Sequence, residues 1–352
     1  MAYYDGTKLL SMKDINNNTP ELYLCTTNRT GGKTTYFSRL LVNRWMKYRE
    51  KFMLVYRYNY ELDDIADKFF KDIKGLFFNG WEMTSERRAK GIYHDLLLHP
   101  PGSSPEDAGI PCGYAVSLNS VDAIKKYSHM FSDVARMFMD EFQSETNHYC
   151  TDEVKKFISL HTSVARGQGK QVRYVPVYMT GNTVSLLNPY YIALGIPDRL
   201  RENTNFLKGD GYVLEQGYVE SASEAQKSSA FNRAFAKSDY IAYSTQGVYL
   251  NDNKAFIEKP EGVGRYVATI RVDGTDYALR EYMQSGYMYC DNKPDLTFPF
   301  RISVTTEDHD INYVMLKAYS GFVDTMRSLF NKGCFRFKNL QSKNAILKLL
   351  SY

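Results

Sequence analysis

The sequence contains no long uncharged hydrophobic run, and this limits the classes of protein that it can encode. A membrane-spanning helix needs about 20 consecutive apolar residues, and no stretch reaches that length. The first residues include Asp5, Lys8, Lys13 and Asp14, so the apolar core of a secretory signal peptide is missing. We expect a soluble, intracellular protein without a membrane partner.

Cysteine is also scarce. The chain has 5 cysteines, at Cys25, Cys112, Cys150, Cys290 and Cys334, and no two of them have C-x-x-C spacing. An odd number of scattered cysteines fits neither a disulfide framework nor a zinc site. The pattern predicts free thiols in a reducing compartment.

A strong excess of one charge is likewise absent, because the formal net charge is only +4. The C-terminal stretch 317–352 is different, with seven basic residues and a single acid, Asp324. Such a surface can attract phosphate backbones, although it can equally be a solvated helical face. The candidate nucleic-acid contacts are Lys332, Arg336 and Lys338. The other basic residues of the stretch are Lys317, Arg327, Lys343 and Lys348.

Length and patterning predict two folded parts. A chain of 352 residues with 43% apolar residues exceeds one typical domain. The first half alternates apolar β-rich runs with helical stretches, which predicts an α/β domain with a parallel sheet. The expected strands are 21–25, 52–56, 136–139 and 172–179, the expected helices are 33–46 and 63–73, and 99–111 is a loop. Pro176 weakens the last of these strands.

The pattern changes after about residue 220. Residues 221–239 are rich in Ala and Ser and helix-compatible, and we interpret them as part of a linker. The predicted organisation is a first domain over 1–220, a linker region over 221–250 and a small α/β or α+β domain over 251–352. In the last domain we expect strands at 265–272, 286–290 and 301–305, a tight turn at 273–274 and a helix at 311–330.

A glycine-rich segment between the first strand and the first helix predicts a phosphate-binding loop. Two glycines let backbone N–H groups surround a phosphate, and the helix dipole favours the same anion. Lys33 can bridge the β- and γ-phosphates of ATP, and the Thr34 hydroxyl can bind Mg²⁺. Thr27 replaces the first glycine of G-x-x-x-x-G-K-[ST], and an ordinary glycine turn is the alternative. The candidate nucleotide-binding residues are Thr27, Asn28, Arg29, Thr30, Gly31, Gly32, Lys33, Thr34 and Thr35.

The apolar strand Met137–Met139 is followed by two carboxylates, Asp140 and Glu141. In a P-loop enzyme the first acid holds Mg²⁺ and the second activates the attacking water. An exposed loop that happens to carry acids is the alternative. Kinases transfer phosphate to a hydroxyl and need no such glutamate, so the pair predicts hydrolysis rather than a nucleotide kinase.

Two further polar residues are candidates for the same chemistry. Asn182 ends the predicted fourth strand of the sheet, where an amide can contact the γ-phosphate or the attacking water; a simple turn is the alternative. Arg166 lies in the glycine-containing segment 163–173 and can neutralise charge in a neighbouring subunit's active site. An arginine on a solvated surface is the alternative.

These motifs, taken in order, resemble the genome-packaging ATPases of the phi-29 group of small tailed phages. The resemblance rests on Arg29-Thr-Gly-Gly-Lys-Thr, the exit of the second strand at 55–62, Met139-Asp-Glu-Phe142 and the segment 181–190. It is clear over 20–195 and looser through 256–259 and 332–337. The family implies a P-loop ATPase domain of the additional-strand, catalytic-glutamate (ASCE) class, a small helical linker and a vestigial RNase H-like α/β domain.

The resemblance also implies a role and partners. Members form a homomeric ring, expected to be a pentamer, at the portal vertex of a procapsid in the host cytoplasm, and pump double-stranded DNA with ATP and Mg²⁺. The portal (connector) and a packaging RNA are the other expected partners. Arg166 falls on the trans-acting arginine finger, and Arg29 on an arginine common in packaging motors. Lys125 or Lys126 lies nearest to a second trans-acting lysine, and Asn59 replaces a DNA-facing basic residue.

The C-terminal domain of the family resembles a nuclease that has lost its acids. A two-metal nuclease needs a carboxylate within its first strand, and the strand at 266–272 has none. We place Asp273 in a turn and Asp291, Asp308 and Asp310 in loops, so we expect no nuclease activity. The leading hypothesis is a DNA-translocating ATPase. The alternatives are a terminase-type motor with an active nuclease and a nucleotide-gated nucleic-acid-binding assembly protein.

Overall fold

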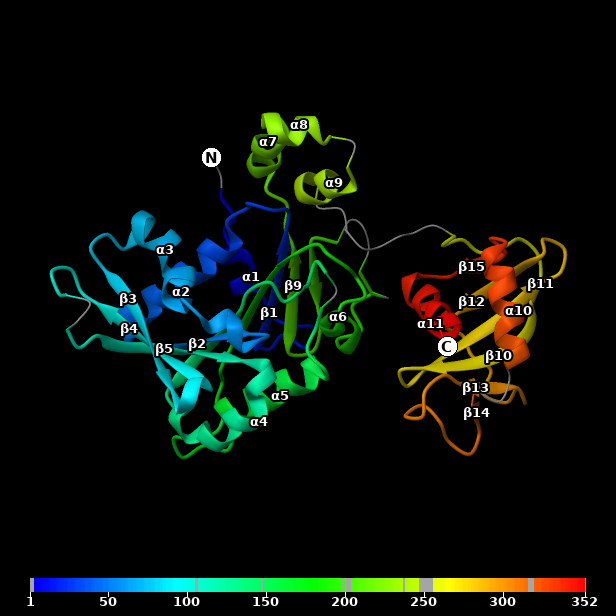
Figure 1. Cartoon of the computed structure of the whole chain (residues 1–352), viewed down its shortest axis with the longest axis horizontal. Helices are drawn as coiled ribbons and strands as arrows, with labels where there is room; N and C mark the ends of the chain where they lie inside the picture. The colour runs from blue at the N-terminus through cyan, green and yellow to red at the C-terminus, as the bar shows by residue number, and fades with distance from the viewer. Residues whose placement is uncertain are drawn as a thin grey trace. The chain divides into compact units, whose positions relative to one another are not determined.

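The chain folds into two compact units, residues 1–251 and 252–352, which are described separately. The computed structural model in Figure 1 describes residues 3–104, 107–146, 148–197, 199–200, 204–236, 238–246, 256–315 and 320–351. Within these ranges no helix has the length and hydropathy needed to span a bilayer. All five cysteines are free thiols, as predicted, and four of them are buried.

The first unit contains a nine-stranded sheet with the order β3-β4-β5-β2-β6-β7-β1-β9-β8. Six neighbouring strands, from β5 to β9, are parallel, while β3-β4-β5 and β9-β8 are antiparallel pairings at the two edges. The strands are β1 Leu22–Thr27, β2 Lys51–Tyr56, β3 Glu82–Arg88, β4 Tyr93–His99, β5 Ile110–Ser117, β6 Val134–Met139, β7 Val177–Asn182, β8 Phe206–Lys208 and β9 Tyr212–Gln216.

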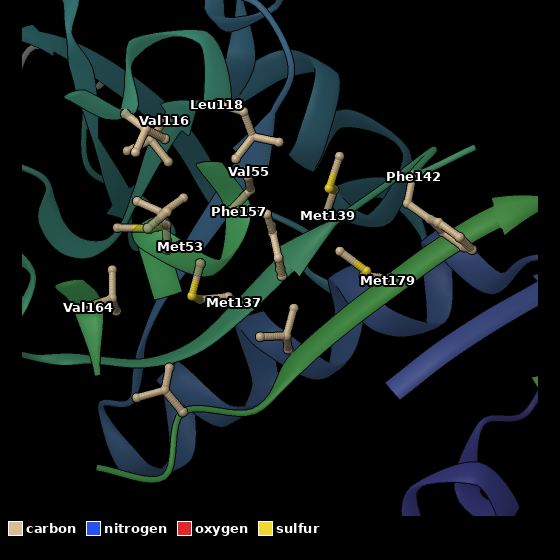
Figure 2. Packing of buried hydrophobic residues seen from close by; sticks show 14 of the residues in the cluster. Met53, Val55, Val116, Leu118, Met137, Met139, Phe142, Phe157, Val164 and Met179 are labelled. Carbon is tan, nitrogen blue, oxygen red and sulfur yellow. The ribbon is translucent and has the colours of Figure 1, made fainter. Parts of the chain in front are cut away.

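Helices cover both faces of this sheet (Figure 1) because its central strands are apolar on both sides. In β1, Tyr23 and Cys25 pack toward α2 and α3, whereas Leu24 faces the cluster that includes α5. Figure 2 shows this second cluster, in which Met53 of β2 and Met137 of β6 lie near Phe157 of α5. The helices are α1 Thr7–Ser11, α2 Lys33–Tyr48, α3 Ile65–Phe77, α4 Val121–Ile124, α5 Glu153–Val164 and α6 Pro189–Ala193.

The central strands and α2 agree with the sequence predictions, but the start of β7 and several outer strands of the sheet do not. Helix α2 begins at Lys33, as predicted. The strand predicted over 172–179 is wrong in its first half: β7 begins at Val177, directly after Pro176, which has no N–H to donate to a ladder. The predictions also missed β3, β4 and β5. Strand β3 is polar over most of its length and has no apolar run, but β4 and β5 do contain apolar residues.

The segment predicted to be part of a linker forms three helices that belong to the first compact unit. They are α7 Glu220–Ser228, α8 Ala230–Ala234 and α9 Asp239–Gln246. Helix α9 packs beside α7, so the three helices form a small group above the sheet in Figure 1. The separate linker region over 221–250 therefore stays a prediction, and residues 247–250 lie outside the described ranges.

The second unit contains a six-stranded sheet with the order β14-β13-β10-β11-β12-β15. Strands β10, β11 and β12 are antiparallel, and β13, β14 and β15 each pair in parallel with a neighbour. The strands are β10 Arg265–Val272, β11 Thr275–Tyr282, β12 Tyr287–Asp291, β13 Arg301–Ser303, β14 Val314–Met315 and β15 Phe335–Phe337. Helices α10 Ser320–Asn331 and α11 Leu340–Ser351 complete the unit.

Several predictions for this unit are confirmed and two are wrong. Asp273 and Gly274 form the hairpin turn, and both have positive φ, 51° and 72°, as a type I′ turn requires. The helix predicted over 311–330 begins only at Ser320, because Val314 pairs with β13. Lys317 lies outside the described residues. Asp291, which we placed in a loop, is the buried last residue of β12.

Candidate nucleotide-binding and catalytic site

Three neighbouring parallel strands bring the predicted motifs together at one edge of the large sheet. Strands β6, β7 and β1 are adjacent in that order. Thr27, the last residue of β1, pairs in register with Asn182, the last residue of β7, and Asp140 follows the end of β6. The carboxyl ends of parallel strands are where α/β sheets bind ligands. The sheet order therefore places the phosphate-loop residues beside the carboxylates.

The backbone of the glycine-rich loop shows why Thr27 can replace the first glycine of the G-x-x-x-x-G-K-[ST] pattern. Thr27 is still part of β1, so this position needs no left-handed backbone. The left-handed residues are Thr30, with φ 60°, and Gly32, with φ 91°. At Gly31 a Cβ atom would lie 3.0 Å from Thr27 Oγ1, so the turn closes most easily with glycine there. The loop thus keeps its backbone turn without the first glycine.

Lys33 begins α2 and is buried, with only 7% of its surface exposed. Its Nζ donates a hydrogen bond to Asn182 Oδ1 at 2.7 Å. Burial lowers the pKa of this ammonium group, while the nearby Asp140 opposes that shift. The structure therefore brings Lys33 and Asn182, two predicted site residues from distant parts of the sequence, into direct contact.

The two carboxylates after β6 have different surroundings. Asp140 accepts hydrogen bonds from the Thr180 hydroxyl and from the backbone N–H of Glu141, at 2.9 Å for the second. Glu141 has a positive φ of 51°, an uncommon backbone conformation that turns its side chain away from the strand direction. Desolvation raises the pKa of Glu141, and the charges of Asp140 and Glu145 raise it further. A raised pKa is typical of a general base.

Arg57 follows β2 and fixes the backbone around Glu141, a role that the sequence analysis missed. Its guanidinium donates to the carbonyl oxygens of Glu141, at 2.7 Å, and of Phe142. It also forms a buried ion pair with Glu153 of α5, at 3.0 Å, and Tyr190 donates to the same carboxylate at 3.0 Å. An arginine directly after a buried strand was the available sequence signal, but its partner lies 96 residues away.

Arg29 connects the phosphate loop to helix α9. Its guanidinium forms an ion pair with Glu145 and lies 5.9 Å from the ring centre of Tyr243. Tyr243, on α9, donates to the same Glu145 carboxylate at 2.6 Å. Thus α9 contacts the loop through Glu145 and also directly, because the backbone N–H of Arg29 donates to the Ser244 carbonyl of α9 at 3.2 Å. Arg29 is one of the predicted site residues, whereas Glu145 and Tyr243 carry no local sequence signal and were not predicted.

Arg166 is exposed and lies at the opposite edge of the sheet from the phosphate loop. Helix α5 ends at Val164 near the amino end of β6, and the next loop is held there by Arg173, which donates to the Val134 carbonyl at 3.0 Å. A Cβ atom on Gly167 would lie 2.9 Å from Ser132, so the loop packs closely against the residues before β6. Arg166 is therefore separated from the site of its own subunit by the length of the sheet strands.

The remaining candidates from the first unit fall into two groups. Lys125 and Lys126 lie between α4 and β6 and are exposed. Lys125 pairs with Asp122 at 3.0 Å. The side-chain oxygen of Asn59 accepts hydrogen bonds from Ser117 and Ser120, at 2.7 Å for the second, so this amide is used within the fold.

The three candidate basic residues of the second unit differ in their surroundings. Arg336 pairs with Glu258 and lies 3.9 Å from the ring centre of Tyr287, and its side chain is only 11% exposed. The Lys338 ammonium group contacts the side-chain oxygen of Asn292. Lys332 is exposed. The structure therefore uses Arg336 in packing and leaves Lys332 as the most accessible of the three.

The acids at the carboxyl edge of the first unit suit a magnesium–nucleotide complex. Mg²⁺ usually takes one or two protein ligands and completes its shell with phosphates and waters. Asp140 and the exposed Thr34 at the start of α2 supply that number of ligands, and no ion pair of Asp140 occurs among the described residues. Within the same ranges no cluster of three or more His, Cys, Asp or Glu could hold a metal by itself. The donor set thus fits a cation that arrives with a nucleotide.

The strand order, the glycine-rich loop before α2 and the acids after β6 define a P-loop fold of the ASCE class. The model of the podovirus DNA encapsidation protein (Gp16) family matches residues 1–351, and the chain belongs to that family. It is 25% identical to the DNA packaging protein of Bacillus phage phi29 over 352 residues, covering 99% of this chain and 96% of the phage protein.

Two solved structures have the same fold over nearly the whole chain. A chain of the bacteriophage Phi-29 viral genome packaging motor assembly has a TM-score of 0.71 and 22% identity, covering 100% of this chain and 99% of its own length. The Phi-28 gp11 DNA packaging motor has a TM-score of 0.59 and 16% identity, covering 99% and 98%.

Proposed function

We propose that this protein is an ATP-driven motor subunit that moves double-stranded DNA into a viral procapsid. Family membership supports a role in DNA packaging. The contact between Lys33 and Asn182, beside Asp140 and Glu141, supports ATP hydrolysis at the carboxyl edge of the first sheet. Bound Mg²⁺ would be held by Thr34 and Asp140 and would neutralise phosphate charge.

In this proposal each residue of the site has a separate role in binding or hydrolysing ATP. The backbone N–H groups of the loop and the start of α2 bind the phosphates. Lys33 contributes positive charge, and Asn182, already hydrogen-bonded to Lys33, can contact the γ-phosphate or the water. Glu141 accepts the proton of the attacking water, with its backbone held by Arg57.

The position of Arg166 is the observation that supports a ring. Its loop lies at the amino edge of the sheet, while the phosphate loop lies at the carboxyl edge. An arginine there can complete an active site only in a neighbouring subunit, as a trans-acting finger. Lys125 and Lys126, which are exposed between α4 and β6, are candidates for a second trans contact from the family resemblance. A pentameric ring, the portal and a packaging RNA are proposed from the family resemblance.

The test is the steady-state ATPase activity of wild type, Arg166→Ala and mixtures of the two, with and without duplex DNA. Loss of a finger arginine is expected to lower turnover by about 10³-fold or more in assembled rings. Arg166→Ala should still bind ATP and should inhibit wild type in mixtures by more than dilution. Lys170→Ala, an exposed residue of the same loop without a proposed catalytic role, is the matched control. Normal turnover of Arg166→Ala in a DNA-stimulated assembly would exclude the trans finger.

Two alternatives give different results. A terminase-type motor with an active nuclease would nick plasmid DNA with Mn²⁺, and Asp291→Ala would abolish the nicking. A nucleotide-gated assembly protein would hydrolyse ATP slowly and without stimulation by DNA or procapsids. The ion pair between Asp291 and Arg280, at 3.0 Å, disfavours the nuclease, because this acid already has a protein cation as its partner.

A further inference from the structure

Two cavities adjoin the phosphate loop, on different sides. The first, of about 330 Å³, is lined by Arg29, Glu141 and Asn182 and belongs to the hydrolytic end of the site. The second, of about 580 Å³, contains no residue of the proposed catalytic set. Its size lies within the range of small-molecule pockets. A nucleoside triphosphate has its γ-phosphate at one end and its base at the other, so a second cavity is needed for the nucleoside.

The second cavity is joined to the loop by direct contacts. The backbone N–H of Tyr4 donates to the Gly31 carbonyl at 2.8 Å, and a Cβ atom on Gly32 would lie 3.4 Å from the Tyr3 ring. On the other wall, Val219 exchanges two hydrogen bonds with the Asn28 side chain, at 2.9 and 3.1 Å. Both walls are therefore fixed to the backbone that would surround the phosphates.

The lining of this cavity suits a neutral aromatic ligand with N–H donors. Tyr3 and Tyr218 line it and are 72% and 53% exposed, so both rings are accessible to a ligand. Asp5, Glu215, Glu220 and Glu224 supply carboxylate acceptors, and no lysine, arginine or histidine is among the described lining residues. Such a lining repels phosphate and accepts amino groups and ribose hydroxyls.

We propose that this cavity is the nucleobase subsite, in which Tyr3 and Tyr218 stack on the base and a carboxylate, led by Glu215, accepts from its exocyclic amino group. The proposal rests on the ATPase function proposed above and adds the residues that select the base. Glu215 is suited to this role because it is half-buried and already oriented by the Tyr4 hydroxyl, which donates to its Oε2 at 2.6 Å. Its second oxygen is the expected acceptor.

The test compares equilibrium binding of ATP, inosine triphosphate and inorganic tripolyphosphate to the full chain. Inosine lacks the exocyclic amino group, and tripolyphosphate lacks the nucleoside. Base stacking is typically worth enough to change affinity by about 10-fold. We therefore expect Tyr3→Ala and Tyr218→Ala each to weaken ATP binding by about 10-fold while tripolyphosphate binding stays unchanged. Tyr3→Phe should retain ATP affinity, and Tyr48→Ala, an exposed tyrosine on α2, is the control.

Glu215→Gln keeps one acceptor oxygen for the Tyr4 hydroxyl but removes the charge and replaces the second oxygen by an N–H donor. We expect this variant to reduce the preference for ATP over inosine triphosphate, again with normal tripolyphosphate binding. Equal binding of ATP, inosine triphosphate and tripolyphosphate by wild type would overturn the base subsite while leaving the phosphate site intact. Failure of wild type to bind tripolyphosphate or ATP at all would instead overturn the proposed ATPase. Unchanged ATP binding in the Tyr3→Ala, Tyr218→Ala double variant would also overturn the subsite.

Discussion

Both units carry carboxylates on or next to strands, but the surroundings of these carboxylates differ. Acids of the second unit are paired with arginines or with backbone N–H groups, whereas the two acids after β6 in the first unit have no ion-paired cation in the described part of the chain. In the second unit Arg271 pairs with Asp276, at 3.0 Å, and with Asp310, at 2.7 Å. Asp291 pairs with Arg280, and Asp308 accepts from the backbone N–H groups of the 273–274 turn. In the first unit Asp140 and Glu141 have no arginine or lysine ion pair among the described residues.

The difference teaches how to distinguish a structural acid from a chemical one. A buried carboxylate is costly unless it is paired, so an acid with a protein cation as partner has its charge compensated within the fold. Asp140 lies beside the phosphate loop and is oriented by the Thr180 hydroxyl and a backbone N–H, but within the described ranges it has no protein cation as ion-pair partner. Such an acid is available to bind a cation from solution. By this criterion the carboxylates of the second unit are structural, whereas Asp140 and Glu141 of the first unit remain available for the proposed chemistry.

The largest expected effect comes from the acids themselves. Glu141→Gln should lower ATP turnover by about 10²–10⁴-fold with ATP binding retained, because the general base is lost. Asp291→Asn should leave turnover unchanged. In wild type the raised pKa of Glu141 means that activity falls as pH falls through a value above that of an ordinary glutamate. A pH–rate profile of wild type and of Glu145→Gln checks this, since removing the Glu145 charge should shift the acidic limb to lower pH.

Equal turnover in Glu141→Gln and wild type would refute the assignment of a chemical acid to the first unit. A loss of turnover in Asp291→Asn without loss of folding would refute the assignment of structural acids to the second.

The next effect concerns stability. Arg57 and Glu153 have side chains only 9% and 1% exposed, so Arg57→Ala leaves a buried charge unpaired and should destabilise the first unit by about 3–5 kcal/mol. Arg280 is more exposed, at 25%, and Arg280→Ala should cost the second unit about 1–3 kcal/mol. Denaturant titration followed by hydrogen exchange reports each unit separately. If Arg57→Ala lowered the free energy of unfolding by less than Arg280→Ala does, the Arg57–Glu153 pair would not be the more important of the two ion pairs, contrary to this prediction.

The smallest effect is local. Tyr243→Phe removes one hydrogen bond to Glu145 and should weaken the docking of α9 by about 1 kcal/mol. Faster amide hydrogen exchange in α9, with unchanged exchange in β1 and in the whole second unit, is the expected result. Tyr240→Phe, whose hydroxyl lies farther from the same carboxylate, at 3.3 Å, is the matched control and should have less effect. Equal exchange in wild type and Tyr243→Phe would show that this contact does not hold the helix.

The sequence predicted those parts of the fold and site that depend on neighbouring residues. The strand before Asp140, the start of α2 at Lys33 and the 273–274 turn are local patterns, and the structure has all three. The contacts of Arg29 with Glu145 and of Arg57 with Glu153 join residues 116 and 96 positions apart, and only the folded sheet brings them together. Strand β3 was missed because its mostly polar side chains carry no periodic signal.

The placement of the Arg166 loop and the phosphate loop at opposite ends of the same strands has a consequence for symmetry. A contact in which one copy offers its loop and the next copy offers its site uses two different surfaces, so it is heterologous and cannot close as a two-fold dimer. Copies joined in this way follow one another head to tail. A suitable rotation between them closes a ring, and any other rotation produces an open helix of subunits.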